Sequence, residues 1–155
     1  MKNFGRTYRL IAGTTGTYGF EIGKVDAKTG RALRCTFEVE RGDSESNNSA
    51  TISVYNLSPQ SLAVLMQENC VIDLQAGYEG DLSTIISGTV SRINTEHDGC
   101  DVCTKIDIID GLTATRDTNV STSYRGSING KKILTDAAAS MGCSIVFSPS
   151  CTFPA

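Results

Sequence analysis

The sequence predicts a mainly β protein of the α+β type, a small antiparallel barrel or sandwich with one short inserted helix. Two observations lead to this fold class. Before about residue 115, apolar and polar residues alternate in several short runs that are separated by clusters of turn formers. Between two of these runs, Ser58-Pro59 precedes a stretch in which Leu62, Leu65 and Met66 share one helical face. A helix followed by a strand, near the end of the chain, forms an appendage to this β domain.

The expected strands follow one another at the short intervals that are typical of an antiparallel barrel or sandwich. They cover residues 18–22, 33–39, 51–57, 71–76, 85–93 and 102–109. Gly88 lies inside one of them, where a glycine commonly marks a bulge or a sharp bend. We therefore expect the sheet to curve toward closure at this residue, because a closed barrel has no exposed edges.

The inserted helix has a clear start signal. The Ser58 side chain can accept a hydrogen bond from a free amide of the first turn. Pro59 suits the first helical position, since its missing N–H would have no partner there. The sequence thus predicts a strand, a capped helix and a further strand between residues 50 and 78.

After residue 112 the pattern changes. Residues 113–126 are rich in Thr and Ser and predict a connecting arm, whereas 129–142 place apolar residues on one helical face and end at Gly142, a typical C-terminal cap. Residues 143–147 predict a strand. We therefore expect a β-barrel domain at 1–112, an arm at 113–126 and the start of an incomplete α/β domain at 127–155. A helix and a strand bury little alone, so this sequence is expected to be a fragment, a truncated gene product, or a subunit whose last elements dock on another chain.

Six cysteines permit three disulfides, but nothing in the N-terminal residues has the apolar core of a secretion signal. In a reducing compartment, buried cysteines act as small apolar side chains. In the expected strand, polar and apolar residues alternate, and Cys35 occupies one of the apolar positions. We therefore expect its side chain to point into the core. Cys70 and Cys143, at the starts of predicted strands, are expected there too.

One group of residues has metal-like spacing, namely His97, Cys100 and Cys103. A structural zinc site needs four ligands, and in a regular strand the two cysteines would lie on opposite faces. Asp98-Gly99 is a favoured hairpin turn, so the simplest interpretation places His97 and Cys100 beside a hairpin tip. The alternatives are a zinc or iron–sulfur site completed by Cys70, Cys151 or another subunit, and a Cys100–Cys103 redox pair.

The residues needed for common catalytic sites are not recognisable. His97 is the single histidine, and the sequence contains no nucleophile elbow, phosphate-binding loop or His-Glu-x-x-His motif. We expect neither an enzyme nor a bound cofactor. The net charge of −3 also argues against binding free DNA through bulk electrostatics. No apolar run reaches the roughly 20 residues that span a bilayer, so we expect synthesis in the cytoplasm and no membrane anchor.

Three stretches resemble the N-terminal part of phage tail hub proteins, the baseplate-hub and late-control-D-like group. They are ISVYNLSPQSLAVL, IDLQAGYEGDLSTIISGTV and DIIDGLTATRDTNVSTSYRGSINGKKILTDAAASMG, in that order. The resemblance covers roughly residues 33–142. The resemblance rests on patterns of spacing and packing. It implies that the protein has a structural role and is not an enzyme.

The resemblance implies a barrel like that of the tail tube subunit and a homotrimeric ring that joins the tube to the central spike and baseplate. It implies a location in the virion tail after assembly in the bacterial cytoplasm, with DNA as passing cargo in the lumen. We expect subunit contacts in the loop at 40–49 and the arm at 116–125. The candidate interface residues are Arg41, Gly42, Asp43, Glu45, Asn47, Asn48, Arg116, Asp117, Tyr124 and Arg125. Either segment can also be read as an ordinary exposed loop.

Two alternatives remain open. A tail tube, terminator or adaptor subunit shares the expectation of a small β fold with an added helix. A carbohydrate-binding β module of a tail fibre or adhesin belongs to another class, and the absence of Trp from the sequence argues against it because sugar sites usually offer aromatic faces.

Overall fold

The computed structural model describes residues 5–14, 19–23, 32–42, 47–78, 81–148 and 152–153. The chain divides into two compact units, Met1–Leu112 and Thr113–Ala155. The first unit contains the whole hydrophobic core of buried residues, whereas the described part of the second unit consists of two helices and extended segments.

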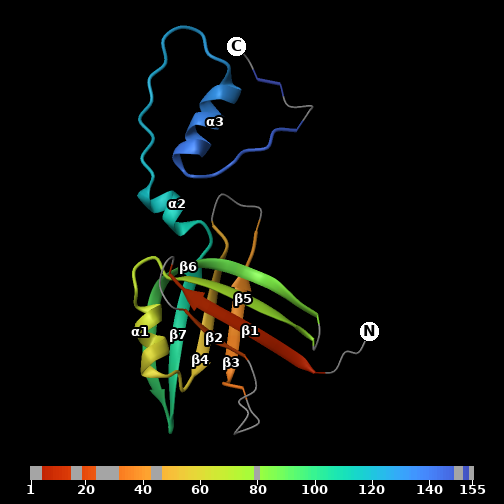
Figure 1. Ribbon diagram of the computed structural model, residues 1–155, viewed down its shortest axis with the longest axis vertical. Helices are drawn as coiled ribbons and strands as arrows, with labels where there is room; N and C mark the ends of the chain where they lie inside the picture. The colour runs from red at the N-terminus through yellow and green to blue at the C-terminus, as the bar shows by residue number, and fades with distance from the viewer. Residues whose placement is uncertain are drawn as a thin grey trace. The chain divides into compact units, whose positions relative to one another are not determined.

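The first unit is built on one seven-stranded antiparallel sheet (Figure 1), which confirms the mainly β fold class. Its strands follow the order β2-β1-β5-β6-β7-β4-β3. The bounds are β1 (Arg6–Gly13), β2 (Phe20–Ile22), β3 (Cys35–Glu40), β4 (Ser49–Tyr55), β5 (Val71–Tyr78), β6 (Asp81–Asp98) and β7 (Asp101–Ile109).

Strand β6 links the two halves of this sheet. It is 18 residues long and pairs with β5 through its first half and with β7 through its second. The register shifts between Val90 and Arg92, which marks a bulge in the middle of the strand. The sheet curls, so that β1 crosses in front of β3 and β4 in Figure 1.

The core lies between the two halves of the curled sheet. Alternate residues of each central strand point into it, as period-two patterning requires. Its fully buried side chains include Leu10, Ile52, Ile72, Leu74, Ile106 and Ile108, which come from β1, β4, β5 and β7. Cys70 is also fully buried, which confirms its predicted core position.

Helix α1 (Pro59–Leu65) is the predicted inserted helix. The Ser61 backbone N–H donates to the Ser58 hydroxyl oxygen at 3.1 Å, and Pro59 occupies the first turn, both as expected. Leu65 buries its side chain in the core, whereas Met66 caps the helix and stays exposed. This short helix of seven residues, about two turns, thus covers part of the core through Leu65.

Strand β4 ends at a residue with an uncommon backbone conformation. Asn56 has a φ of 57°, in the left-handed region that asparagine tolerates better than most residues. Its Nδ2 donates to Asp101 Oδ1 at 2.8 Å, and its Oδ1 accepts from the Val102 N–H at 3.0 Å. The side chain therefore ties the exit of β4 to the start of β7.

Two sequence expectations about turns and bends are corrected. Gly88 pairs in register with Ile72, and β6 has register shifts on either side of it, opposite Leu74 and Gln75 and between Val90 and Arg92. A Cβ at Gly88 would lie 2.8 Å from the Ile109 carbonyl oxygen, so close strand approach is what requires glycine there. The β6–β7 turn is Gly99-Cys100 and not Asp98-Gly99, since Asp98 pairs with Asp101 and Gly99 supplies the positive φ of 65°.

Strand β1 is not among the strands expected from the sequence, although it lies in the centre of one half of the sheet. Its inward positions are Tyr8, Leu10 and Ala12, but Ile11 interrupts the apolar and polar alternation on the outer face. Strand β2 covers only residues 20–22 of the expected run, and Tyr18 lies outside the described residues.

The second unit contains α2 (Leu112–Asp117) and α3 (Gly130–Ser140). Helix α2 occupies the first part of the expected arm, so the extended segment begins at residue 118. Helix α3 begins at the predicted place, after the N-cap Asn129, and it ends in a Schellman motif. In that motif the Cys143 N–H donates to the Ala138 carbonyl and Gly142 has a φ of 67°.

The strand expected at 143–147 does not form, because no strand exists among the described residues of this unit to satisfy its backbone groups. Cys143 is exposed, which contradicts its predicted core position. Helix α3 buries none of its residues, and Ile133 and Leu134 are 44% and 43% exposed.

Within the described ranges, no helix has the length and apolarity that crossing a bilayer would require.

Candidate functional site

The loop at 40–49 is described at its two ends. Arg41 extends from the end of β3 and donates from Nη1 to the Ile85 carbonyl of β6 at 3.2 Å. The Gly42 N–H donates to Asn48 Oδ1 at 3.3 Å, and the Asn48 carbonyl accepts from the Asp110 N–H at 2.9 Å. Asn47 is exposed. Asp43 and Glu45 lie outside the described residues.

The arm predicted to contact a neighbouring subunit contains neither helix nor strand between residues 118 and 129. At its start, Arg116 donates to both carboxylate oxygens of Asp117, at 2.6 and 2.9 Å, and this bond lowers the pKa of Asp117. Residues 119–123 are all exposed, as is Arg125. None of the backbone or side-chain groups of residues 118–123 forms a hydrogen bond with another described residue.

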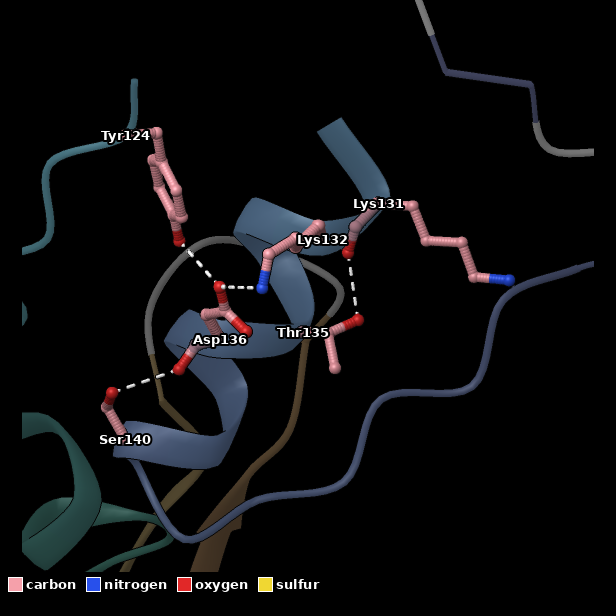
Figure 2. A network of polar contacts seen from close by, with 6 residues as sticks. All are labelled: Tyr124, Lys131, Lys132, Thr135, Asp136 and Ser140. Atoms are coloured by element: carbon pink, nitrogen blue, oxygen red, sulfur yellow. Dashed lines mark hydrogen bonds and ion pairs between the residues drawn. The ribbon is translucent and has the colours of Figure 1, made fainter. Parts of the chain in front are cut away.

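The far end of the arm is fixed on α3 (Figure 2). The Tyr124 hydroxyl donates to Asp136 Oδ2 at 2.8 Å, and Lys132 Nζ lies 3.1 Å from the same oxygen. The Tyr124 hydrogen bond, followed by that of Lys132, lowers the pKa of Asp136. Tyr124 thus joins the arm to α3, and residues 118–123 form no hydrogen bond with any other residue that the structure describes.

A cavity of about 590 Å³ opens between the starts of β1 and β3 and the end of β5. It is lined mainly by inward-facing residues, namely Arg6, Thr7, Tyr8, Cys35, Phe37, Ala76, Gly77, Tyr78 and Ile85. The Tyr8 hydroxyl donates to the Leu33 carbonyl, which joins β1 to the segment before β3. Phe37 faces this cavity and is 38% exposed, although its position in the strand is an inward one.

Burial shapes the chemistry of this cavity. It raises the pKa of the Cys35 thiol to about 11. Burial also raises the pKa of Tyr8 to about 12, with the neighbouring Cys35 contributing a smaller part. A thiolate is the nucleophilic form of cysteine, so Cys35 is protonated and unreactive near neutral pH. Cys35 is half-buried and packs against the core, as a small apolar side chain would.

The metal-like group is dispersed around the β6–β7 hairpin. His97 is exposed in β6, Cys100 is exposed in the turn, and Cys103 is buried in β7. Among the residues that the structure describes, no three His, Cys, Asp or Glu side chains gather closely enough to hold a metal ion. Cys151, one possible distant ligand, lies outside these residues.

Sequence reasoning did not find the residues that line the cavity beside β3. The signal for Tyr8 was its alternation with Leu10 and Ala12, which places it on the inner face of a strand. Phe37 was assigned to an alternating strand, but the partial exposure of its ring follows from the position of β3 at the end of the sheet. An edge position is a property of strand order, which a single sequence does not encode locally.

No family model matches this sequence, and no curated protein matches it. Among solved structures, the chain is similar to one described as the virion of a native gene transfer agent (GTA) particle. The TM-score is 0.42 and the sequence identity is 13%. The alignment covers 81% of this chain and 47% of the other, so the chain spans about half the length of that structural relative.

Proposed function

We propose that this chain is a structural subunit of a phage-like virion and that it forms the hub ring that joins the tail tube to the baseplate and central spike. The observation that supports this most is the order of elements between Ser49 and Tyr78. Strands β4 and β5 belong to one curled antiparallel sheet and are connected by the capped helix α1, in the segment where the sequence resembles tail hub proteins.

The two edge strands of the sheet are consistent with a subunit that assembles with other chains. Strands β2 and β3 occupy its edges, and within the described residues neither has a strand on its outer side. An exposed edge offers unpaired N–H and C=O groups to another chain, and natural monomers usually protect such edges. Strand β3 is six residues long, contains no proline and shows no register shift against β4.

The second unit also supports a role in assembly. Helix α3 has apolar residues on one face that the rest of the unit covers only partly, and Val146 is 93% exposed. Large apolar side chains that remain accessible in one subunit are frequently covered by a partner. In the proposed ring, tail tube and spike proteins are further partners, and DNA passes through the lumen without specific binding. The virion tail is the proposed location.

Light scattering coupled to size-exclusion chromatography tests the proposal. We expect a species of three times the 16.5 kDa chain mass to grow with concentration from the micromolar to the millimolar range, and negative-stain images of it to show rings. A hexameric ring would favour the tail tube or terminator alternative. A strict monomer throughout this range would contradict the proposed ring, and metal analysis on the same peak tests the expectation that no metal is bound.

A further inference from the structure

The open edge of β3 has a defined pattern of backbone groups. The Tyr55 N–H donates to the Arg34 carbonyl at 3.0 Å, and Cys35 pairs with Val54. Because hydrogen-bonded and non-hydrogen-bonded pairs alternate along an antiparallel ladder, residues 36, 38 and 40 direct their backbone groups toward β4. The N–H and C=O groups of Cys35, Phe37 and Val39 therefore point to the open edge.

The side chains at this edge define what an added strand must carry. The inward side chains of Cys35 and Phe37 line the 590 Å³ cavity, so inward residues of an added strand need to be apolar or β-branched. On the outer face, Glu38 and Glu40 are exposed, and no described cation lies within ion-pair distance of either carboxylate. A suitable strand therefore has no acidic residues and has a basic residue within reach.

Residues 118–123 of the arm have the complementary properties. The sequence Thr-Asn-Val-Ser-Thr-Ser is β-branched at alternate positions 118, 120 and 122, contains no acidic residue and is followed by Arg125. The segment belongs to neither a helix nor a strand, and its backbone groups form no hydrogen bonds with other described residues. Its six residues match the length of β3.

We propose that residues 118–123 of one copy add as an extra strand to the open edge of β3 in a second copy. The unpaired backbone groups of the two segments satisfy one another, Val120 and Thr122 cover Phe37 and the cavity, and Arg125 approaches the carboxylates of Glu38 and Glu40. The contact joins two different surfaces of the same chain, and such a head-to-tail contact generates a ring when its rotation closes. This inference rests on the proposed function and identifies the contact that builds the ring.

Proline substitution in the arm tests the backbone part of the contact. Residues 118–123 form no hydrogen bond with another described residue, so proline substitutions there leave the contacts within the subunit in place. Neighbouring residues of a strand direct their N–H groups to opposite sides, so Val120→Pro combined with Ser121→Pro removes the one N–H of this pair that faces β3. We expect self-association to weaken by about fivefold or more, since one lost hydrogen bond is worth about 1 kcal/mol. The matched control, Val120→Ala with Ser121→Ala, keeps both donors and is expected to associate within about threefold of the unmodified chain by the same reasoning.

Amide hydrogen exchange tests the site directly. The probe is a synthetic peptide covering Asp117–Arg125, added in excess to the full chain. We expect the amides of Cys35, Phe37 and Val39 to exchange at least about tenfold more slowly with the peptide, because hydrogen bonding protects them. The amides of Thr36 and Glu38, which already face β4, serve as internal controls and are expected to keep their rates.

The two measurements separate the contact from the ring. Rings that survive the proline variant, with no protection of β3 by the peptide, would overturn the β3 contact and leave the hub function standing. A monomeric chain whose β3 amides are protected by the peptide supports the contact but contradicts the ring. A monomer without protection would overturn both, and protection by a strand of another virion protein in place of the peptide overturns the choice of a second copy.

Discussion

Individual residues in the first unit show how strand position governs their chemistry. Cys35 and Tyr8 face inward from β3 and β1, but the sheet does not close between these two strands. Their side chains are therefore half-buried at the cavity wall, where burial disfavours the charged forms of both groups. The raised pKa of each of these two groups therefore depends on the burial that the cavity wall provides.

The first prediction concerns the pH dependence of stability at Cys35. Its pKa rises from the ordinary value of 9.0 to about 11 on folding, so above pH 9 the unfolded chain loses a proton that the folded chain retains. The unfolded state then binds fewer protons, and the free energy of unfolding falls as pH rises from 9 toward 11. We expect Cys35→Ala to flatten this part of the profile, measured by urea unfolding at a series of pH values.

Cys100 supplies the matched control for that experiment, because it is exposed in the hairpin turn. Cys100→Ala, which removes a thiol that lies outside the cavity, is the control variant for the same series of pH values. Equal slopes in the Cys35→Ala variant and the unmodified chain would show that the Cys35 thiol is as solvated in the folded state as in the unfolded one. Alkylation followed by mass spectrometry offers an independent check, with Cys100 modified faster than Cys35 at pH 8.

At the scale of elements, local signals determine where α1 begins, and long-range pairing determines how far each strand extends. Helix α1 starts at Pro59 because Ser58 caps it, and both residues lie next to one another in the sequence. The 18-residue length of β6 depends instead on β5 and β7, which pair with different halves of it. The sequence accordingly predicted the helix and part of β6 but not the full strand.

The second prediction tests the cap of α1. We expect Ser58→Ala to lower the free energy of unfolding by about 1 kcal/mol, because the Ser61 N–H loses its acceptor. The measurement is urea unfolding at neutral pH. Gln60→Ala, at an exposed position of the same helix, is the control and is expected to change stability by less than about 0.5 kcal/mol.

Alanine is the better helix former, so a loss in Gln60→Ala as large as that in Ser58→Ala would indicate that side-chain contacts of α1 matter as much as the cap. Helix α1 also bears on the core, because it supplies the buried Leu65. The capped helix is therefore expected to unfold together with the sheet, in one transition that fluorescence and circular dichroism report equally.

For the whole molecule, the core positions follow from local sequence patterns, whereas the candidate interface depends on the order of strands in the sheet. Every buried core residue, from Leu10 to Ile108, lies within the first unit and within a strand, in α1 or directly beside one of these elements. Alternation predicted most of these positions. The open edge of β3, and the lack of hydrogen bonds from residues 118–123 to other described residues, could be predicted only in part. Strand order and the absence of a strand at 143–147 depend on which partners exist in three dimensions.

The third prediction follows from this distribution of the core. We expect a chain ending at Asp117 to fold, with a free energy of unfolding within about 1 kcal/mol of that of the full chain, since it retains the complete core. The isolated segment 113–155 is expected to show little helix by circular dichroism, because α3 buries none of its residues and isolated helices of this length are marginal. Urea unfolding of the shortened chain checks the first expectation.

Aggregation or a non-cooperative transition of the shortened chain would mean that the sheet needs the second unit to fold. A stable helical signal from the isolated segment would mean that its own contacts, such as that of Tyr124 with Asp136, suffice to order it.

The length of β6 has a mechanical consequence. One unbroken backbone passes from the β1–β5 half of the sheet into the β4–β7 half, so a force that pulls the halves apart is carried by covalent bonds. Packed faces can peel apart one contact at a time, whereas this arrangement requires rows of hydrogen bonds on both sides of β6 to shear together. The two halves of the sheet therefore separate under load only if β6 loses its pairing with β5 or with β7.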